Sequence, residues 1–149
     1  MQLSTKARYA ARAMIELALC YGQGPVKLKD IARRQDISIK YLEQVMCPLR
    51  VKGYVHTQKG SQGGYYLAKP PDEVSLYDIV HSVEGSLSPV SCLDSPDDCN
   101  RVNICVTRKA WSRLKDVIID ELKSTSLAIL AEEQRLSYAS HNDNIMYQI

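Results

Sequence analysis

The sequence lacks any apolar run long enough to span a membrane, and it contains no internal repeat and no low-complexity tract. Its first residues, MQLSTKARYAARAM, also lack the apolar core of a signal peptide. We therefore expect a cytoplasmic protein with no membrane partner. The 149 residues, 45% of them hydrophobic, suit one globular domain with a core, or a small domain with an added dimerisation element.

The residue patterns of catalysis are missing as well. There is no Ser-His-Asp set, no pair of catalytic carboxylates and no nucleotide-binding fingerprint. A glycine-rich stretch at 60–64 is followed neither by a helical pattern nor by a Lys-Ser or Lys-Thr pair, which argues against a phosphate-binding P-loop. We do not expect an enzyme.

Charge is unevenly distributed, although the net charge is only +2. Residues 1–71 contain 12 Lys and Arg against 4 Asp and Glu, whereas residues 72–149 contain 7 against 13. A basic front half followed by an acidic back half is typical of a chain whose front half binds a polyanion. An ordinary solvated surface would show the same imbalance, so charge alone does not decide between the two.

The front half predicts a helix-turn-helix. The stretch KARYAARAMIELALCYG has helical spacing, with Ser4 or Thr5 as its cap and Gly22 and Gly24 at its end. The stretch VKLKDIARRQDISIKYLEQVM then predicts two short helices joined by a turn, with Ser38 capping the second. Pro48 predicts an end or a kink near Met46, followed by a last turn.

The second of these helices is suited to the major groove of DNA, although a helical hairpin with a polar face would give the same pattern. Its exposed side chains include donors for phosphate oxygens and groups that can contact base edges. The expected DNA-facing residues of this helix are Ser38, Lys40, Tyr41, Glu43 and Gln44.

A β-hairpin follows, with strands near 54–58 and 65–68 around the glycine-rich tip. A hairpin directly after a recognition helix is the wing of a winged helix. Lys59 and Gly60 at the tip are expected to approach DNA, since the lysine can contact a phosphate or the minor groove and glycine permits close backbone approach. The expected fold is therefore mainly α with a small β-wing, and residues 1–71 form the DNA-binding domain.

The back half begins with a capped helix at Ser75 and then a polar loop, which together make up a linking region over residues 72–105. A long amphipathic pattern predicts one continuous helix over 106–134, followed by a poorly anchored tail at 135–149. That helix is too long for so small a domain to cover, so we expect it to pair with its own copy in a homodimer. A dimer would suit double-stranded DNA with a palindromic operator.

The polar loop carries Cys92, Cys99 and Cys105 in the spacing C-x6-C-x5-C. Three thiols in a reducing compartment can hold an iron–sulfur cluster, bind zinc, exchange disulfides or have no function. Structural zinc fits less well, because it prefers four closed ligands and a C-x2–4-C knuckle. Cys20 is expected to fill the core. Cys47 is expected to pack beside Pro48 at the end of the recognition helix, with a redox-sensitive thiol near DNA as the alternative.

Four stretches together carry a family resemblance: LSTKARYA, ISIKYLEQVMCPLRVKGYV, KGSQGGYYLAKP, and the cysteine spacing followed by VTRKAWSRL. Over roughly residues 1–130 the chain resembles the winged-helix repressor family that includes IscR, NsrR and CymR. The resemblance implies a homodimeric transcription regulator. It also implies that the three loop cysteines hold an iron–sulfur cluster, [2Fe–2S] rather than [4Fe–4S], and that the DNA-facing residues are those named above.

One position departs from the branch of that family that controls cluster assembly, which places a histidine three residues after the last cysteine. Here that residue is Arg108, whose guanidinium keeps its proton and does not coordinate. The nitric-oxide-sensing branch uses an acid of the partner's first helix, and the matching residue here is Arg8. Candidates for a fourth ligand are Asp94, Asp97, Asp98, Asn103, His81, a group of the other subunit, or an exogenous thiol or water.

We therefore expect a regulator that senses iron–sulfur cluster status and controls cluster-biogenesis genes. The alternative is a thiol-redox or nitric-oxide-responsive repressor without a stable cluster.

Overall fold

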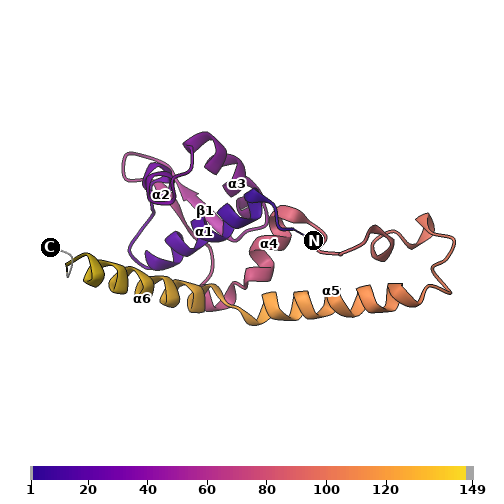
Figure 1. Cartoon of the computed structure of the whole chain (residues 1–149). Coiled ribbons are helices and arrows are strands. Elements are labelled where there is room, and N and C mark those ends of the chain that lie inside the picture. The colour runs from indigo at the N-terminus through magenta and orange to yellow at the C-terminus, as the bar shows by residue number, and fades with distance from the viewer. Residues whose placement is uncertain (1, 147–149) are drawn as a thin grey trace.

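The computed structural model describes residues 2–146, with side chains as far as Asn142 (Figure 1). The elements in chain order are α1 (Thr5–Leu19), α2 (Leu28–Gln35), α3 (Ile39–Val51), β1 (Val55–Gln58), β2 (Gly64–Leu67), η1 (Pro71–Glu73), α4 (Leu76–Glu84), η2 (Ser91–Leu93), η3 (Pro96–Asp98), α5 (Val106–Ser124) and α6 (Leu127–Met146). Within this described part, no helix combines the length and the apolar content needed to cross a bilayer.

Side-chain caps start the helices at the expected places. Ser4 Oγ accepts a hydrogen bond from the Ala7 amide at 3.1 Å, and Ser38 Oγ accepts one from the Tyr41 amide at 3.2 Å. Ser75 and Asp78 form the reciprocal bonds of a capping box at the start of α4. Each of these bonds satisfies an amide that has no partner inside its own helix.

The turn of the helix-turn-helix lies at Asp36, which adopts a left-handed conformation with φ of 52°. The residue allows α2 to stop after Gln35 and the chain to reach Ser38, where α3 begins. Aspartate tolerates this conformation better than most residues do. The strands β1 and β2 pair antiparallel, with Val55 opposite Leu67 and Gln58 opposite Gly64.

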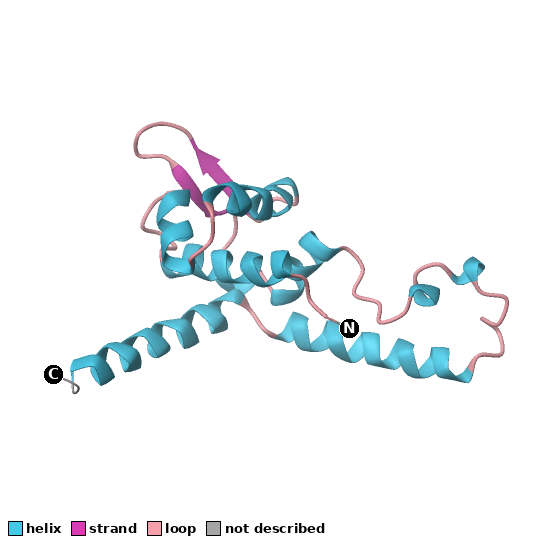
Figure 2. Ribbon diagram, turned by 45° about the horizontal axis from the view of Figure 1, so that its top comes forward, coloured by secondary structure: helices cyan, strands magenta, loops and turns pink. Residues whose placement is uncertain are grey.

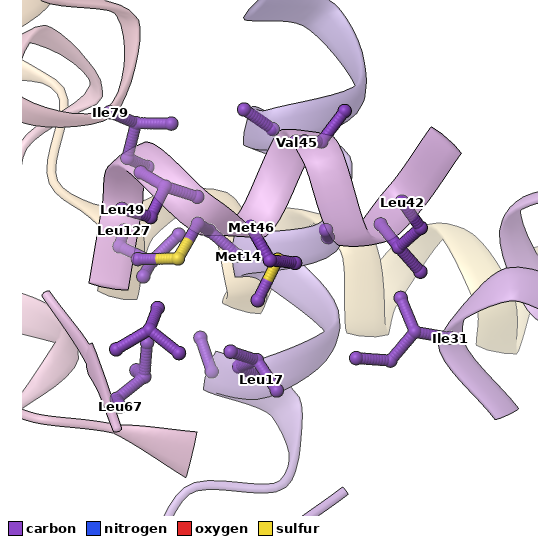
Figure 3. Close-up of a cluster of buried hydrophobic side chains, with 14 of the residues drawn as sticks. Met14, Leu17, Ile31, Leu42, Val45, Met46, Leu49, Leu67, Ile79 and Leu127 are labelled. Carbon is purple, nitrogen blue, oxygen red and sulfur yellow. The ribbon is translucent and has the colours of Figure 1, made fainter. Parts of the chain in front are cut away.

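One hydrophobic core holds the winged-helix body together (Figure 3). Met14 and Leu17 of α1 meet Ile31 of α2 and several side chains of α3, and Leu67 closes the core from the wing. Leu127 of α6, far along the chain, is fully buried in the same cluster. The predicted winged helix with a small β-wing is confirmed.

The proline in α3 has less effect than the sequence suggested. Instead of ending near Met46, α3 continues to Val51 with Pro48 inside it. Met46 and Leu49 on either side of the proline are fully buried, and this packing stabilises the last turn of the helix.

The expected single helix over 106–134 is wrong, because the chain breaks between α5 and α6. Ser75 and Ser126 form an antiparallel β-bridge at this break. The Leu76 amide donates to the Thr125 carbonyl at 2.8 Å, and the Leu127 amide donates to the Val74 carbonyl at 2.7 Å. These bonds draw the backbone out of helical geometry and hold it against the start of α4.

The prediction of a poorly anchored tail is also wrong for the residues that the structure describes. The chain from residue 135 to Met146 continues α6, and Tyr138 donates a hydrogen bond to Glu16 of α1. Both ribbon views show α6 beside the winged-helix body and α5 leading away from it, with the cysteine loop at the far end (Figures 1 and 2).

Candidate nucleic-acid interface and cysteine loop

The exposed face of α3 forms one wall of a recess of about 520 Å³. Lys40, Glu43 and Gln44 line it, and Tyr65 of β2 forms part of it. The structure therefore brings three of the predicted DNA-facing residues together with the wing. Lysine can pair with phosphate, and glutamate and glutamine offer the acceptors and donors that match base edges.

Ser38 and Tyr41 lie at the start of the same helix. Ser38 is exposed, and its hydroxyl oxygen caps α3. Tyr41 is half-buried, with its ring edge-on to Tyr9 of α1 at a centroid distance of 5.9 Å. Tyr41 is thus held by the body of the protein, whereas Lys40 before it and Glu43 and Gln44 after it are exposed.

Lys59 and Gly60 are exposed at the tip of the wing. Gly60 has φ of 107°, a conformation that favours glycine. The wing is attached to the segment before α2 near its tip, where the amide and carbonyl of Val26 exchange 2.8 Å hydrogen bonds with Tyr65 of β2. The wing is thereby joined to the segment that enters the helix-turn-helix. That these residues contact DNA stays a prediction.

Two further residues line the α3 recess that the sequence did not single out. Arg50 follows Glu43 by seven positions, and it therefore lies on the same face of the helix. That periodicity was available in the sequence and could have identified it. Tyr65 could not have been found this way, because only the pairing of the wing brings it to α3.

The three loop cysteines are free and half-buried. Cys92 lies in η2, Cys99 follows η3, and Cys105 is the N-cap residue of α5, without a side-chain capping bond. The pKa of Cys105 is lowered, first by its contact with the Thr107 hydroxyl at 3.2 Å and then by the backbone amide of Arg108. Arg108 Nε itself donates to the Cys92 carbonyl at 3.3 Å, so this arginine ties the start of the loop to the start of α5.

Asp94, a candidate fourth ligand, is already engaged. Its carboxylate accepts hydrogen bonds from Ser86 and Ser88 at 2.5 Å each and pairs with Lys115 Nζ at 3.1 Å. The serine hydroxyls, with a smaller effect of the lysine, lower its pKa to about 2. His81, another candidate, stacks on Tyr77 with a centroid distance of 5.1 Å.

Among the described residues, no three His, Cys, Asp or Glu side chains are gathered closely enough to hold one metal ion. The three thiols nevertheless have the donor chemistry that iron–sulfur clusters use, and they lie on one loop. The donor set fits such a group, and the loop must close for all three thiols to reach it.

Helix α5 has an apolar stripe that the described part of the chain leaves exposed. None of its residues is buried. Trp111, Leu114 and Val117 are 41%, 43% and 65% exposed, and they recur at helical spacing.

Comparisons with known proteins agree with this geometry. A family model described as Rrf2, an iron-dependent transcriptional regulator, matches residues 3–133. The transcriptional regulator IscR of Photorhabdus laumondii is 38% identical, over 97% of this chain and 88% of its own.

Two solved structures are similar over most of the chain. One is CymR of B. subtilis, described as its global cysteine regulator, with a TM-score of 0.76 and 40% identity over 89% of this chain and 98% of that one. The other is T. potens IscR, with a TM-score of 0.74 and 37% identity over 90% and 88%. The chain belongs to the Rrf2 family of DNA-binding transcription regulators.

Proposed function

We propose that this regulator acts as a homodimer and senses iron–sulfur cluster status through Cys92, Cys99 and Cys105, controlling genes of cluster biogenesis. The observation that carries the proposal is the position of the three free thiols, on the one loop that joins the winged-helix body to α5. Thiolates are the ligands that hold iron in such clusters, and a [2Fe–2S] cluster bound here would supply a group sensitive to oxygen and nitric oxide.

The loop is fastened to the body before it and to α5 after it. Before the loop, Glu84 of α4 accepts a 2.7 Å hydrogen bond from the Ser4 amide at the start of α1. After the loop, Cys105 is the residue that directly precedes α5, and Lys115 of α5 pairs with Asp94 of the loop. Drawing the three thiols together would therefore constrain the start of α5 against α4, and α4 packs on the helix-turn-helix body.

The dimer is supported by the uncovered stripe of α5. A helix with this much exposed apolar surface gains stability when a second copy covers it. A two-fold axis along paired α5 helices would present two recognition helices, which suits a palindromic operator of double-stranded DNA.

The cluster is tested by anaerobic purification followed by an absorption spectrum and by iron and sulfide assays. We expect a brown protein with equimolar iron and sulfide, and we expect Cys99→Ser to lose most of both. Cys47→Ser is the matched control, since Cys47 is a free thiol outside the loop. A colourless protein with stoichiometric zinc would exclude the cluster.

DNA recognition is tested with the promoter of the protein's own operon. Replacing Tyr41 and Gln44 by alanine should abolish the specific shift, because both lie on the proposed DNA-facing side of α3. A control carries Tyr21→Ala and Gln23→Ala, which change the same residue types at exposed positions after α1. Specific binding that survives in the first double variant would contradict the assignment of α3.

A second candidate is a thiol-redox repressor without a stable cluster. It is favoured by the free, half-buried state of the loop thiols, by the lack of a gathered ligand group in the described residues, and by the likeness to CymR. Two thiols would form a disulfide by passing two electrons and two protons to hydrogen peroxide, which becomes water. Iron-free protein whose DNA binding is lost with peroxide and restored by a reductant, with the disulfide found by mass spectrometry, would favour this candidate.

A further inference from the structure

A buried carboxylate, Glu16 of α1, lies at the centre of a hydrogen-bond network. None of the proposed DNA-facing residues belongs to this network. Its side chain is 1% exposed. Three donors surround it: Gln35 Nε2 at 2.6 Å, Arg34 NH1 at 3.1 Å and the Tyr138 hydroxyl at 3.1 Å. A buried charge persists only where such partners replace water, so each donor matters to its position.

The network continues from Glu16 to the turn before the recognition helix. Gln35, the last residue of α2, is itself buried and receives two bonds from Arg12: Nε to its side-chain oxygen at 2.6 Å and NH2 to its carbonyl at 2.8 Å. Asp36 follows in the left-handed conformation, and Ser38 then caps α3. Because only three positions separate Gln35 from Ser38, a displacement of Gln35 would also move the start of α3.

A second route from the same network reaches a DNA-facing side chain. The Arg12 guanidinium lies 5.2 Å from the centre of the Tyr9 ring, and Tyr9 contacts Tyr41 edge-on. Arginine over an aromatic face is attractive, and edge-to-face aromatic pairs are directional. The position of Arg12 thus bears on Tyr41 as well as on the turn.

Tyr138 is the contribution of α6 to this network. The first turns of α6 are held to the body by the hydrogen bond from the Leu127 amide to the Val74 carbonyl and by the burial of Leu127 and Ala131. Tyr138 follows Leu127 by three helical turns and makes a second, polar attachment. Burial, and then the charge of Glu16, raise the pKa of Tyr138, so its hydroxyl keeps the proton that it donates.

We propose that Tyr138 is a positioning residue for DNA binding: through Glu16 and Gln35, α6 fixes the turn that sets the angle of the recognition helix. Because α6 directly follows α5, this contact also transmits a displacement of α5 to the helix-turn-helix. The proposal rests on DNA binding and requires no cluster.

The test is Tyr138→Phe, which removes one hydroxyl from a side chain that is 43% exposed and leaves the packing of α6 in place. Tyr21→Phe is the matched control, since Tyr21 is 48% exposed and lies outside the network. Affinity is measured for a duplex selected in vitro by the unaltered protein, and hydrogen exchange is followed in residues 36–44. We expect about fivefold or more loss of affinity and faster exchange in this segment for Tyr138→Phe alone.

Unchanged affinity in Tyr138→Phe would overturn the proposal. So would a lower melting temperature with unchanged affinity and unchanged exchange in 36–44, because that result assigns the hydroxyl to stability only. If the unaltered protein selects no duplex, DNA binding itself fails, and the proposal falls with it.

A double-mutant cycle with Glu16→Gln tests the route. If Tyr138 acts through Glu16, adding Tyr138→Phe to Glu16→Gln should cause little further loss of affinity. Losses that multiply independently would show that the two residues act separately, which contradicts the proposed connection.

Discussion

Asp78 shows how a single side chain joins two elements. Its carboxylate accepts bonds from the Ser75 amide at 2.8 Å and the Ser75 hydroxyl at 2.7 Å, and also from the Tyr54 hydroxyl at 3.0 Å. Tyr54 directly precedes β1, so Asp78 links the base of the wing to the start of α4. Burial acts to raise the pKa of Asp78, but the bonds from Ser75 and Tyr54 outweigh it and the net pKa is lowered.

We predict that Asp78→Asn lowers the free energy of unfolding by about 1 kcal/mol at neutral pH, as expected when a helix cap is removed. Since the folded pKa lies below the ordinary value of 3.8, the stabilisation is present above that pH and is lost as the pH falls through the folded pKa. The difference in the free energy of unfolding between Asp78→Asn and the unaltered protein should therefore shrink below about pH 4. Urea unfolding across pH measures it, with Asp72→Asn, an exposed acid in η1, as the control.

Among the elements, the wing depends on a glycine at its closest approach to the body. A Cβ added to Gly64 would lie 2.3 Å from the Val26 carbonyl oxygen. That oxygen is held by the Tyr65 amide at 2.8 Å and has little freedom to move.

Gly64→Ala should therefore push the wing away from the segment before α2, with a loss of about 1–3 kcal/mol in unfolding free energy. DNA affinity should fall with it, because Lys59 and Gly60 are carried by the displaced hairpin. Ser61→Ala, at the exposed tip, should change neither quantity. Thermal unfolding and gel shifts test both effects. A Gly64→Ala variant as stable as the unaltered protein would contradict the close approach of the wing to Val26.

Helix α5 gives the prediction for assembly. Leu114→Lys places a charge in the middle of the apolar stripe and should convert the proposed dimer into monomers of 16.8 kDa. Asp116→Lys introduces the same side chain on the opposite face of α5 and should leave the dimer intact. Light scattering coupled to size exclusion distinguishes these outcomes. If Leu114→Lys remained a dimer, the dimer interface would have to lie on another surface.

The break after α5 shows where sequence patterns fail. The positions Leu122, Thr125 and Ile129 keep helical spacing across it, so periodicity predicts one helix. A local signal was present, because Ser126 Oγ accepts from the Ile129 amide as a cap. The cause, however, is the bridge to Ser75, which joins residues 51 positions apart and leaves no periodic trace.

At the scale of the whole molecule, the basic front half should dominate DNA affinity. We predict that binding weakens steeply with salt, and that Lys40→Ala reduces the slope of log K against log salt by about 0.9 for each phosphate that the variant no longer neutralises. Lys109→Ala, on α5, removes the same charge away from the winged-helix body and should leave the slope unchanged. Fluorescence anisotropy over a salt series provides the measurement.

The sequence predicted the winged helix well, because caps, turn residues and core spacing are local. It also placed Lys40, Glu43 and Gln44 on one face, since helical periodicity decides that. It did not predict the contact between Tyr138 and Glu16, which are 122 positions apart. Nor did it show that Asp94 is held by Ser86, Ser88 and Lys115, because that depends on how the loop folds back on α5.

The β-bridge between Ser75 and Ser126 has one more consequence. The chain leaves the body after α4 and returns at the point where α4 began. The segments before and after the cysteine loop are therefore each attached to the body independently of the loop. The front piece has its own core, and the back piece contributes Leu127 and Ala131 to it. A protease that severed the loop between Asn100 and Arg101 would therefore leave two fragments bound as one particle, with the recognition helix still in place and the thiols divided between separate chains.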